Sequence, residues 1–263
     1  MYRNIQEIGK GTYGTVYRAE MESDGTIVAI KKVKLDNPDE GVPCTTLREI
    51  AILRATRHPN IVEVKDVIST KKAIHIVFEY FPFDLHKYMK HVKFLPYSLV
   101  CSYTRQLLSA VDHIHALGFI HRDIKPQNIL VSQNNLKLCD FGLARSSTLP
   151  VSSLSSDVIT RWYRPPELLK EAKEYGTEID IWSVGCVVGE MLAGAPLFPS
   201  ASVQEHLQLI LEYSREGEEW LKRKVGHVER GMLELLGRLL DPDPTTRITA
   251  ADALKNRSVA CTR

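Results

Sequence analysis

The eight residues from His121 to Asn128 read His-Arg-Asp-Ile-Lys-Pro-Gln-Asn and decide how the rest of the chain is interpreted. They place the Asp123 carboxylate, the Lys125 ammonium and the Asn128 amide close together, directly after a long amphipathic pattern. Transfer of a phosphoryl group to a hydroxyl needs a base, a charge clamp and a magnesium ligand, and these three side chains can supply them. The stretch therefore predicts a phosphoryl-transfer site.

The bulk properties are those of an ordinary folded protein. The chain has 263 residues, of which 44% are hydrophobic and 25% charged, and its formal net charge is +2. This length is typical of about two domains. Because Lys and Arg are spread along the chain, binding to nucleic acid or to a membrane surface is not indicated as the main activity. We expect no nucleic-acid and no membrane partner.

Cysteine spacing and the N-terminal sequence bear on the compartment. The five cysteines lie far apart and never form a Cys-x-x-Cys pattern, which argues against a disulfide framework and a zinc site and favours a reducing compartment. Met1 is followed directly by Tyr-Arg-Asn-Ile, and no run approaches about 18 apolar residues. We therefore expect no signal peptide or membrane span, and a cytoplasmic or nuclear location.

The first third of the chain has the pattern of a sheet with one helix. Strands are predicted at Thr15–Ala19, Thr26–Val33 and Ile74–Phe78, where short runs are rich in Val and Ile, and Ser23-Asp24-Gly25 predicts a hairpin turn. A helix is predicted from Pro43 to about Arg57, because apolar residues recur there at helical spacing.

After the connector Tyr80–Asp84 the apolar period becomes helical, so we place the boundary of two parts there, at residues 1–81 and 82–263. Ser98 is the expected N-terminal cap of the first long helix and Gly118 its expected stop. Thr249 and Asp252 have the spacing of a capping box for a last short helix. The longer helices are predicted at Ser98–Leu117, Ile179–Leu192, which should be buried because it is apolar almost all round, and Glu229–Leu240.

Several weaker signals lie on either side of the central stretch. Gly9, Gly11 and Gly14 lie between two strand-like runs, where the backbone could approach phosphates without Cβ collisions. The next strand ends in Lys31, and Glu49 lies on the only helix of this part. Taken singly, the glycines are better explained by a hairpin turn, and the two charges by solvated surface residues.

Further signals follow in the second part. Asp140-Phe141-Gly142, Pro165-Pro166-Glu167, Asp180 and Arg247 appear in that order. A triplet such as Asp-Phe-Gly is frequent by chance and is usually a turn. Chance does not explain why all these signals occur together, in this order, along nearly the whole chain.

These motifs resemble the eukaryotic protein kinases and, within them, the cyclin-dependent kinases, over roughly Tyr2 to Leu254. The subfamily resemblance rests on Gly11-Thr-Tyr-Gly14, Pro43-Cys-Thr-Thr-Leu-Arg-Glu49, Asp140-Phe-Gly-Leu-Ala-Arg145 and Thr160-Arg-Trp-Tyr-Arg164. The resemblance implies an α+β bilobal fold, with an N-terminal five-stranded antiparallel sheet, one regulatory helix and a mainly helical C-terminal lobe. It also implies a Ser/Thr protein kinase that uses ATP and Mg²⁺, and a buried ion pair between Glu167 and Arg247.

The resemblance assigns the chemical roles. Asp123 would accept or orient the proton of the substrate hydroxyl, and Lys125 would stabilise the transferring phosphoryl group. Asn128 and Asp140 would hold Mg²⁺ ions that bridge the phosphates of ATP.

ATP would lie between the two lobes, with Phe78 at the back wall of its pocket. Lys31 would hold the α- and β-phosphates and would be oriented by an ion pair with Glu49. The remaining ATP-binding positions implied are Ile8, Gly9, Gly11, Gly14, Val16, Ala29, Glu79, Phe81, Asp84 and Leu130.

Phosphorylation is the first implied means of regulation. Arg48, Arg122 and Arg145 match three arginines that converge on a phosphate in the activation segment, and the position that they would meet is Ser155, with neighbouring serines as alternatives. An upstream kinase would add that phosphate. Thr12 and Tyr13 resemble an inhibitory phosphorylation pair in the loop over the ATP phosphates.

Partner proteins are the second means of regulation. The Pro43–Glu49 stretch resembles the helix that cyclins push inward, and Leu47 and Ile50 would face such a cyclin-like activating subunit, although either could pack on the sheet instead. Val158–Arg164 resembles the platform for the residue after the phosphorylated Ser or Thr, which in this subfamily is proline. Protein substrates with Ser/Thr-Pro are therefore expected.

Three alternatives remain open. A pseudokinase scaffold would be favoured by loss of a catalytic residue, and the chain is shorter than usual for the subfamily between Pro199 and Arg247, with an atypical C-terminal tail. A mitogen-activated-type kinase generally has a Thr-x-Tyr pair, which is absent from Ser146–Ser156. Cys139, directly before Asp140, is more simply a packed residue than a reactive thiol.

Overall fold

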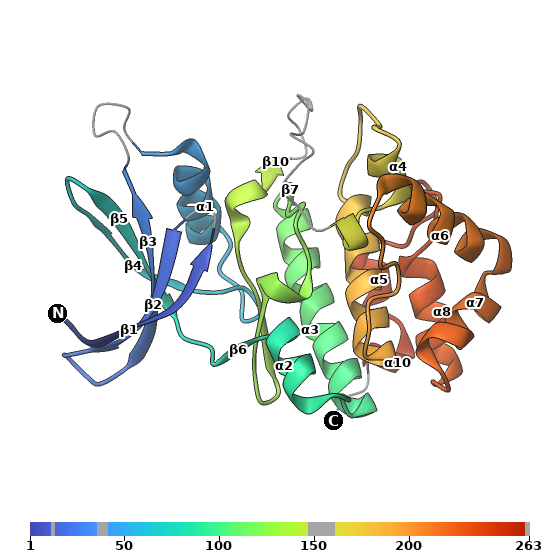
Figure 1. Cartoon of the computed structure of the whole chain (residues 1–263), viewed down its shortest axis with the longest axis horizontal. Helices are drawn as coiled ribbons and strands as arrows, with labels where there is room; N and C mark the ends of the chain where they lie inside the picture. The colour runs from blue at the N-terminus through green and yellow to red at the C-terminus, as the bar shows by residue number, and fades with distance from the viewer. Residues whose placement is uncertain (12–13, 36–41, 147–160, 261–263) are drawn as a thin grey trace.

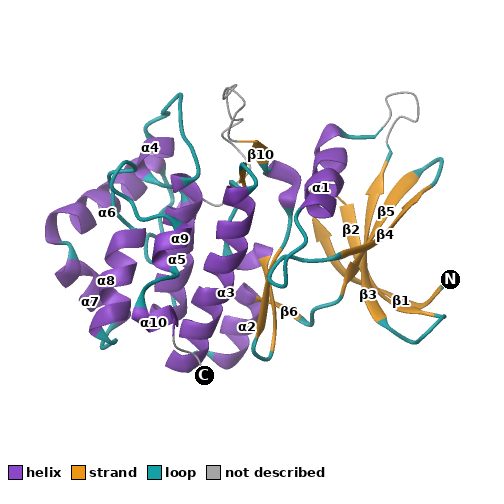
Figure 2. Cartoon of the chain, turned by 180° about the vertical axis from the view of Figure 1, so that it is seen from behind, coloured by secondary structure: helices purple, strands orange, loops and turns teal. Residues whose placement is uncertain are grey.

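The N-terminal sheet lies at one end of an elongated molecule, and the helices of the second part lie toward the other end (Figures 1 and 2). A computed structural model of the chain describes residues 1–11, 14–35, 42–146 and 161–260. Its strands are β1 (Tyr2–Gly11), β2 (Gly14–Met21), β3 (Ile27–Lys34), β4 (Val64–Ser69), β5 (Ala73–Glu79), β6 (Phe83–Asp84), β7 (Phe119–Ile120), β8 (Ile129–Ser132), β9 (Asn135–Leu138) and β10 (Arg145–Ser146).

The helices make up most of the second part. They are α1 (Cys44–Ala55), α2 (Leu85–Val92), α3 (Tyr97–Ala116), α4 (Pro166–Leu169), α5 (Glu178–Ala193), α6 (Val203–Glu216), α7 (Glu218–Val225), α8 (Arg230–Leu239), α9 (Ala250–Ala253) and α10 (Arg257–Ala260), with short 3-10 helices η2 (Pro126–Asn128), η3 (Phe141–Leu143) and η4 (Arg161–Tyr163).

The first five strands form one antiparallel sheet in the order β1-β2-β3-β5-β4, which confirms the predicted sheet. The expected hairpin at Ser23–Gly25 joins β2 to β3, and the Gly25 N–H donates to the Met21 carbonyl at 2.9 Å. Alternate residues of β3 serve two faces: Val28 and Ile30 pack into a small cluster on one side, while Ala29 and Lys31 lie on the side of the main core.

Among the helices of the described residues, α1 alone lies beside this sheet (Figure 1). It begins at Cys44 rather than at Pro43, which is its N-cap, and it ends at Ala55 rather than near Arg57. The early end has a local cause, since His58 precedes a proline and is disfavoured in helical conformation. The buried face of α1 carries Thr46, Glu49, Ile52 and Leu53.

Helix α3 differs from its prediction at one end only. The predicted cap at Ser98 is wrong, because the Pro96 carbonyl already accepts hydrogen bonds from the N–H groups of Leu99 and Val100, at 2.9 and 3.0 Å. Gly118 ends the helix as predicted, with a φ of +75° that non-glycine residues rarely adopt. The Thr249 side chain caps α9 by accepting from the Asp252 N–H at 3.1 Å, as the capping-box spacing indicated.

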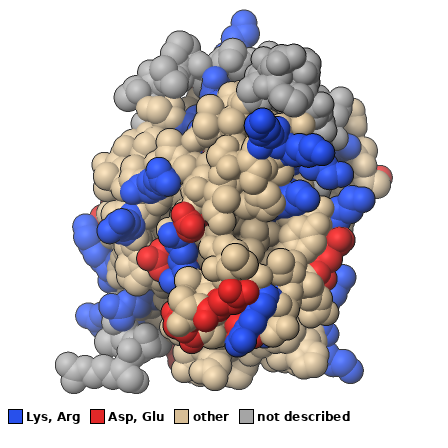
Figure 3. Space-filling model, turned by 90° about the vertical axis from the view of Figure 1, so that its left-hand side faces the viewer, with Lys and Arg blue, Asp and Glu red and all other residues tan. Residues whose placement is uncertain are grey.

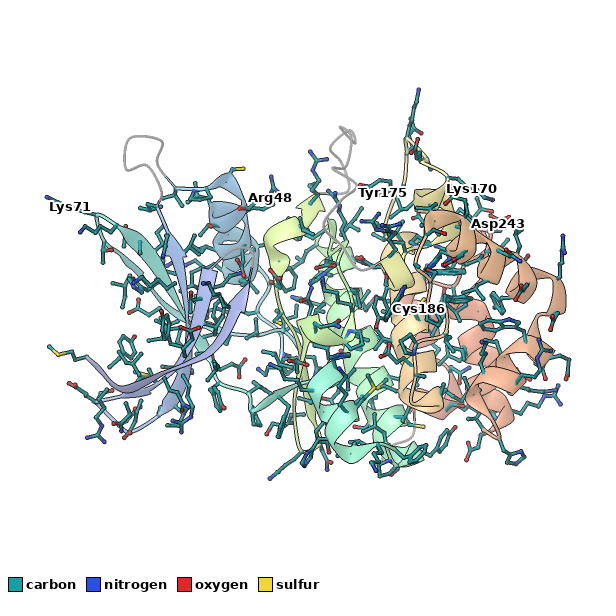
Figure 4. All side chains as sticks on the ribbon, in the orientation of Figure 1. Arg48, Lys71, Lys170, Tyr175, Cys186 and Asp243 are labelled. Atoms are coloured by element: carbon teal, nitrogen blue, oxygen red, sulfur yellow. The ribbon has the colours of Figure 1, made fainter. Side chains whose placement is uncertain are left out.

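Helix α5 lies in the centre of the helical part, and Figure 4 shows Cys186 on it among the surrounding helices. Thirteen of its residues, from Ile179 to Met191, are buried, which confirms the predicted buried helix. Cys186 and the other cysteines that the structure describes are free thiols.

A buried ion pair connects α4 to the segment between α8 and α9. The Arg247 guanidinium donates to both carboxylate oxygens of Glu167, at 2.7 and 3.0 Å, and also to the backbone carbonyls of Asp241 and Glu178. Its side chain is fully buried. The expected pair between Glu167 and Arg247 is therefore confirmed.

Charges on the outer face of the N-terminal sheet are mixed. Figure 3 shows Lys and Arg side chains around an uncharged centre, with Asp and Glu side chains among them. Among the described residues, no helix combines the length and the apolar character that crossing a membrane requires.

Replacing Arg247 by Gln should lower the free energy of unfolding by about 3–5 kcal/mol, because the Glu167 carboxylate is left without its partner in a largely buried position. The matched control is Arg230→Gln, since Arg230 pairs with Glu234 at an exposed site and its loss should cost at most about 1 kcal/mol. Urea unfolding of both variants measures the difference. Equal losses in the two variants would contradict this account.

Candidate active site

The first element of the site is an ammonium group shared between two carboxylates. Lys31 Nζ donates to Glu49 Oε1 at 2.9 Å and Oε2 at 2.8 Å, and it lies 3.7 Å from Asp140 Oδ1. The expected pair of Lys31 with Glu49 is therefore confirmed. The Lys31 ammonium thus connects β3 to Glu49 on α1 and to Asp140 in the segment after β9.

Burial and charge act in opposite directions on Lys31. Burial by itself lowers the pKa of the Lys31 ammonium, but the carboxylates of Glu49 and Asp140 outweigh it and raise the pKa above its ordinary value. Lys31 thus stays a cation at neutral pH, as a group that binds phosphates must.

A buried carboxylate holds the loop from His121 to Asn128. Asp180 of α5 accepts hydrogen bonds from the backbone N–H groups of His121 and Arg122, at 2.7 and 2.8 Å, and His115 Nε2 lies 2.9 Å from Asp180 Oδ2. Burial raises the pKa of Asp180, but the bond from His115 and the nearby charges outweigh it and hold the pKa below its usual value. These bonds help to hold Arg122 in a left-handed backbone conformation, with φ of 71°.

Asp180 is one of the ordered sequence signals and lies on the helix predicted to be buried. His115 was not predicted, because it has the pattern of an ordinary helix residue. Nothing in the sequence shows that α3 and α5 bring the two side chains together.

His121 connects the loop to the segment around Asp140. Its Nε2 lies 3.0 Å from the Cys139 carbonyl, and its ring meets the Phe141 ring edge-on with centroids 4.8 Å apart. Phe141 and Leu53 belong to the same buried core, and Val64 packs against that core. The Cys139 thiol donates to the Asn128 carbonyl at 3.3 Å and burial raises its pKa, as expected for a packed residue rather than a nucleophile.

The chemical side chains of the loop form one hydrogen-bonded cluster. Lys125 Nζ donates to both carboxylate oxygens of Asp123, at 3.0 and 2.8 Å. Asn128 Nδ2 donates to the Asp123 carbonyl at 2.8 Å and to its Oδ2 at 2.7 Å. Asp123 is 8% exposed, so its orientation is set by these bonds rather than by solvent.

The donor set fits magnesium. Because the Asn128 amide nitrogen is engaged with Asp123, its Oδ1 is the atom left for a metal ion, and Asp140 supplies a carboxylate. Mg²⁺ prefers oxygen ligands and is usually held by one or two protein groups together with substrate phosphates. Within the described ranges no group of three or more His, Cys, Asp or Glu side chains could hold a metal ion, so a site shared with phosphates fits better than an all-protein cage.

Strand register aligns the residues predicted to surround a nucleotide. Gly9 pairs with Val16, which in turn pairs with Lys31, so the three form a row across β1, β2 and β3. Asp84 pairs with Leu130 between β6 and β8. Ala29 pairs with Phe78, which is nearly buried, whereas Ile8 is exposed.

Gly14 has a reason of its own in the fold. It pairs with Gly11 at the end of the first hairpin, with φ of +145°, and a Cβ atom there would collide with the Lys32 carbonyl oxygen. The strand approach therefore requires glycine at this position, whether or not phosphates lie nearby.

The connector between the two parts is held by side chains. Glu79 forms an ion pair with Lys137 at 2.6 Å, and the Lys137 ammonium lies 6.0 Å from the centre of the Phe81 ring. The Asp84 carboxylate caps α2 by accepting from the Lys87 N–H at 2.8 Å. The backbone groups of Glu79 and Phe81 remain the ones expected to bind adenine.

Comparison with known proteins decides the family. The model of the protein kinase domain matches residues 2–258. The chain is also similar to the cell division control protein 2 homolog 1 of Trypanosoma brucei brucei, with 38% identity over 290 aligned positions that cover 97% of this chain and 96% of that protein.

The chain belongs to the eukaryotic protein kinases, within their cyclin-dependent-kinase-like group. The α+β kinase fold predicted from the motifs is thereby confirmed. A protein kinase domain uses ATP with a divalent metal ion, typically Mg²⁺, and the donor set described above suits both. Because 290 positions exceed the 263 residues of this kinase, the alignment contains gaps in its chain.

The three arginines of the predicted phosphate site share one neighbourhood in this kinase. Burial lowers the pKa of Arg122, and the charges of Arg145 and Arg48 lower it further. The Arg122 guanidinium lies 5.9 Å from the centre of the Tyr175 ring. Figure 4 shows Arg48 and Tyr175 along the same upper edge of the molecule. Tyr175 gave no signal in the sequence.

Three predicted phosphorylation sites cannot be placed. Thr12, Tyr13 and Ser155 lie outside the residues that the structure describes. They stay predictions.

The depressed pKa of Asp180 predicts how its contribution to stability depends on pH. Because the folded value lies below the unfolded value of about 3.9, Asp180 stabilises the fold above that pH, and the contribution is lost as pH falls through the folded value. The gap in unfolding free energy between the wild type and Asp180→Asn should therefore be widest at about pH 5–7 and shrink below about pH 3.9. Urea unfolding across this range measures the gap.

The control for this prediction is Asp66→Asn, which changes an exposed carboxylate on β4. Its gap to the wild type should stay small at every pH. If the Asp180→Asn gap is independent of pH, the assignment of a depressed pKa is wrong.

Proposed function

We propose that this kinase transfers the γ-phosphoryl group of ATP to Ser and Thr hydroxyls of proteins. The observation that carries the proposal is the bonded cluster of Asp123, Lys125 and Asn128, together with the Lys31 ammonium that Glu49 and Asp140 share. Such a cluster contains the parts that phosphoryl transfer needs and leaves little other chemistry to perform.

In this proposal Asp123 orients the substrate hydroxyl and accepts its proton. The amide of Asn128 fixes the Asp123 carboxylate in one orientation, and the Lys125 ammonium next to it neutralises charge that develops on the transferring group. Mg²⁺ held by Asn128 and Asp140 would supply further charge neutralisation at the phosphates when bound. Positioning and charge compensation, rather than covalent chemistry, are then the contribution of the protein.

The nucleotide site follows from the same proposal. Lys31 binds the phosphates, and the glycine-rich hairpin of β1 and β2 lies over them. The adenine lies between Val16 and Ala29 on one side and Leu130 on the other. Residues 1–81 and 82–263 act as the two lobes of one kinase domain, in which this site lies between them.

A pseudokinase scaffold is the other candidate. Its main sequence support is the short segment between Pro199 and Arg247. Catalysis is favoured because Lys31, Asp123, Asn128 and Asp140 are all present and three of them already make the contacts that catalysis requires. We therefore propose an active enzyme.

A partner of cyclin type and a proline-directed substrate preference complete the proposal. The Trypanosoma protein is named for cell division control, and this kinase resembles it over nearly the whole chain. On α1, Leu47 is 53% exposed and available to a partner, whereas Ile50 is half-buried and packs against the core. Only Leu47 of the expected pair therefore suits a partner surface. Cytoplasm or nucleus is the location that we propose.

Asp123→Asn should lower kcat about 100- to 10,000-fold, because the substrate hydroxyl loses its base, while the KM for ATP changes little. Steady-state phosphorylation of a Ser-Pro peptide measures both constants. Asp66→Asn is the control and should behave as the wild type. An Asp123→Asn variant that keeps wild-type kcat would refute this role and favour the scaffold.

Ser155→Ala should reduce kcat/KM by about tenfold or more, since a phosphate at Ser155 would form one to three charge-assisted bonds with the arginine cluster. The comparison uses wild type and variant isolated with their bound partner after treatment with an upstream kinase. Ser152→Ala is the matched control. An unchanged rate for partner-bound Ser155→Ala would eliminate Ser155 as the activating site.

A further inference from the structure

The short helix η4 and the residue after it, Arg164, lie where the substrate platform is expected. On one side this turn is fixed to α5. The Tyr163 hydroxyl donates to the buried Glu190 carboxylate at 2.7 Å, and the Ser183 hydroxyl donates to the Tyr163 carbonyl at 2.8 Å. Both bonds hold the middle of the turn and leave its Trp162 side to be fixed from elsewhere.

The other side of the turn rests on the segment that leads into α6. The Trp162 indole N–H donates to the Ser200 carbonyl at 2.8 Å, and the Ser200 hydroxyl lies 2.9 Å from Nδ1 of His206. His206 is fully buried on α6, which packs against η4. A chain of polar contacts thus runs from the platform to a histidine that takes no part in the proposed chemistry.

His206 is neutral in the folded kinase. Burial lowers the pKa of its imidazole to about 4; a hydrogen bond with the Arg164 backbone acts in the opposite direction, and the charges of Arg164 and Arg161 lower the pKa further. A neutral imidazole carries its proton on one nitrogen only.

The two nitrogens of the ring have different surroundings. Nδ1 lies 2.9 Å from the Ser200 hydroxyl, whereas the buried Nε2 has no hydrogen-bond partner of normal geometry within the described part of the chain. With the proton of the neutral ring on Nε2, the Ser200 hydroxyl can donate to Nδ1. His206 is thereby linked through Ser200 to the Trp162 side of the turn.

An apolar residue would fill this position at lower cost if only packing were required. A buried imidazole whose hydrogen-bonding capacity is partly unused costs stability. A polar residue here is understandable if it orients the turn above it.

We propose that His206 is a positioning residue for the protein substrate: through Ser200 it holds Trp162, and with Trp162 the turn of residues 161–164. The surface that receives the residue following the phosphorylated hydroxyl is thereby fixed. This inference rests on the proposed function and adds a specificity-determining residue to it.

The test compares His206→Leu, which keeps apolar bulk but removes both polar atoms, with His206→Gln, whose amide offers one donor and one acceptor group. The full-length chain with its bound partner is assayed for kcat and KM on a Ser-Pro and a Ser-Ala peptide, and for the KM for ATP. His206→Leu should raise the KM for the Ser-Pro peptide about tenfold, which corresponds to the loss of one hydrogen bond. The KM for ATP should stay unchanged, and kcat should change no more than about twofold.

In His206→Gln the KM for the Ser-Pro peptide should return most of the way to the wild-type value. The control His227→Leu, at an exposed position after α7, should alter none of the constants. The proposal is overturned if His206→Leu keeps the wild-type peptide KM. It is also overturned if kcat and both KM values deteriorate together without rescue by glutamine, since His206 is then merely structural.

Hydrogen exchange gives a second readout that does not depend on activity. Backbone amides of residues 161–164 should exchange faster in His206→Leu than in His206→Gln. A wild-type chain that phosphorylates no peptide or protein refutes the proposed function, and exchange together with binding of a fluorescent Ser-Pro peptide then decides on His206. Equal exchange and equal peptide binding in both variants would overturn the inference.

Discussion

The active site depends on one ammonium group that two carboxylates share. Lys31 binds both oxygens of Glu49 and lies near Asp140, and these three residues come from a strand, a helix and a loop that are far apart in sequence. A buried cation is tolerated only where anions compensate it, so the charge of Lys31 requires α1 and the Asp140 segment to stay in place. The same requirement aligns the lysine proposed to bind phosphates with the carboxylate proposed to bind the metal ion.

A second buried charge, the Asp180 carboxylate, supports the loop from His121 to Asn128. Asp180 accepts hydrogen bonds from the backbone N–H groups of His121 and Arg122, which helps to hold Arg122 in a left-handed conformation that non-glycine residues rarely adopt. Asp123 follows directly, and its carboxylate is then oriented by Lys125 and Asn128. The position of the Asp123 carboxylate therefore depends on a series of hydrogen bonds that begins at Asp180, in the core of the helical part.

Much of this arrangement could be predicted from sequence because its signals are local or ordered. The almost continuously apolar segment predicted α5 to within one residue at each end, and the resemblance to kinases implied the pair of Lys31 with Glu49 and the pair of Glu167 with Arg247. Helix starts were less accurate, since a proline at the cap can begin the hydrogen-bond ladder before the first good helix former, as Pro96 does.

The residues that sequence analysis missed depend on contacts between distant segments. His115 and Tyr175 each have their partner on a distant element, namely Asp180 and Arg122. His206 reaches the distant Trp162 only through Ser200, six residues before His206. No local sequence pattern predicts such pairs. Gly14 shows the reverse case, because its glycine has a structural cause in strand pairing as well as the predicted closeness to phosphates.

The most direct test of the account is a double-mutant cycle on kcat/KM for phosphoryl transfer, built from Lys31→Met, Glu49→Gln and the double variant. If the shared ammonium group organises the site, Glu49 acts only through Lys31, and the double variant should be about as slow as Lys31→Met alone. If instead the losses of the two single variants multiply in the double variant, the two residues act independently, and the central claim is contradicted.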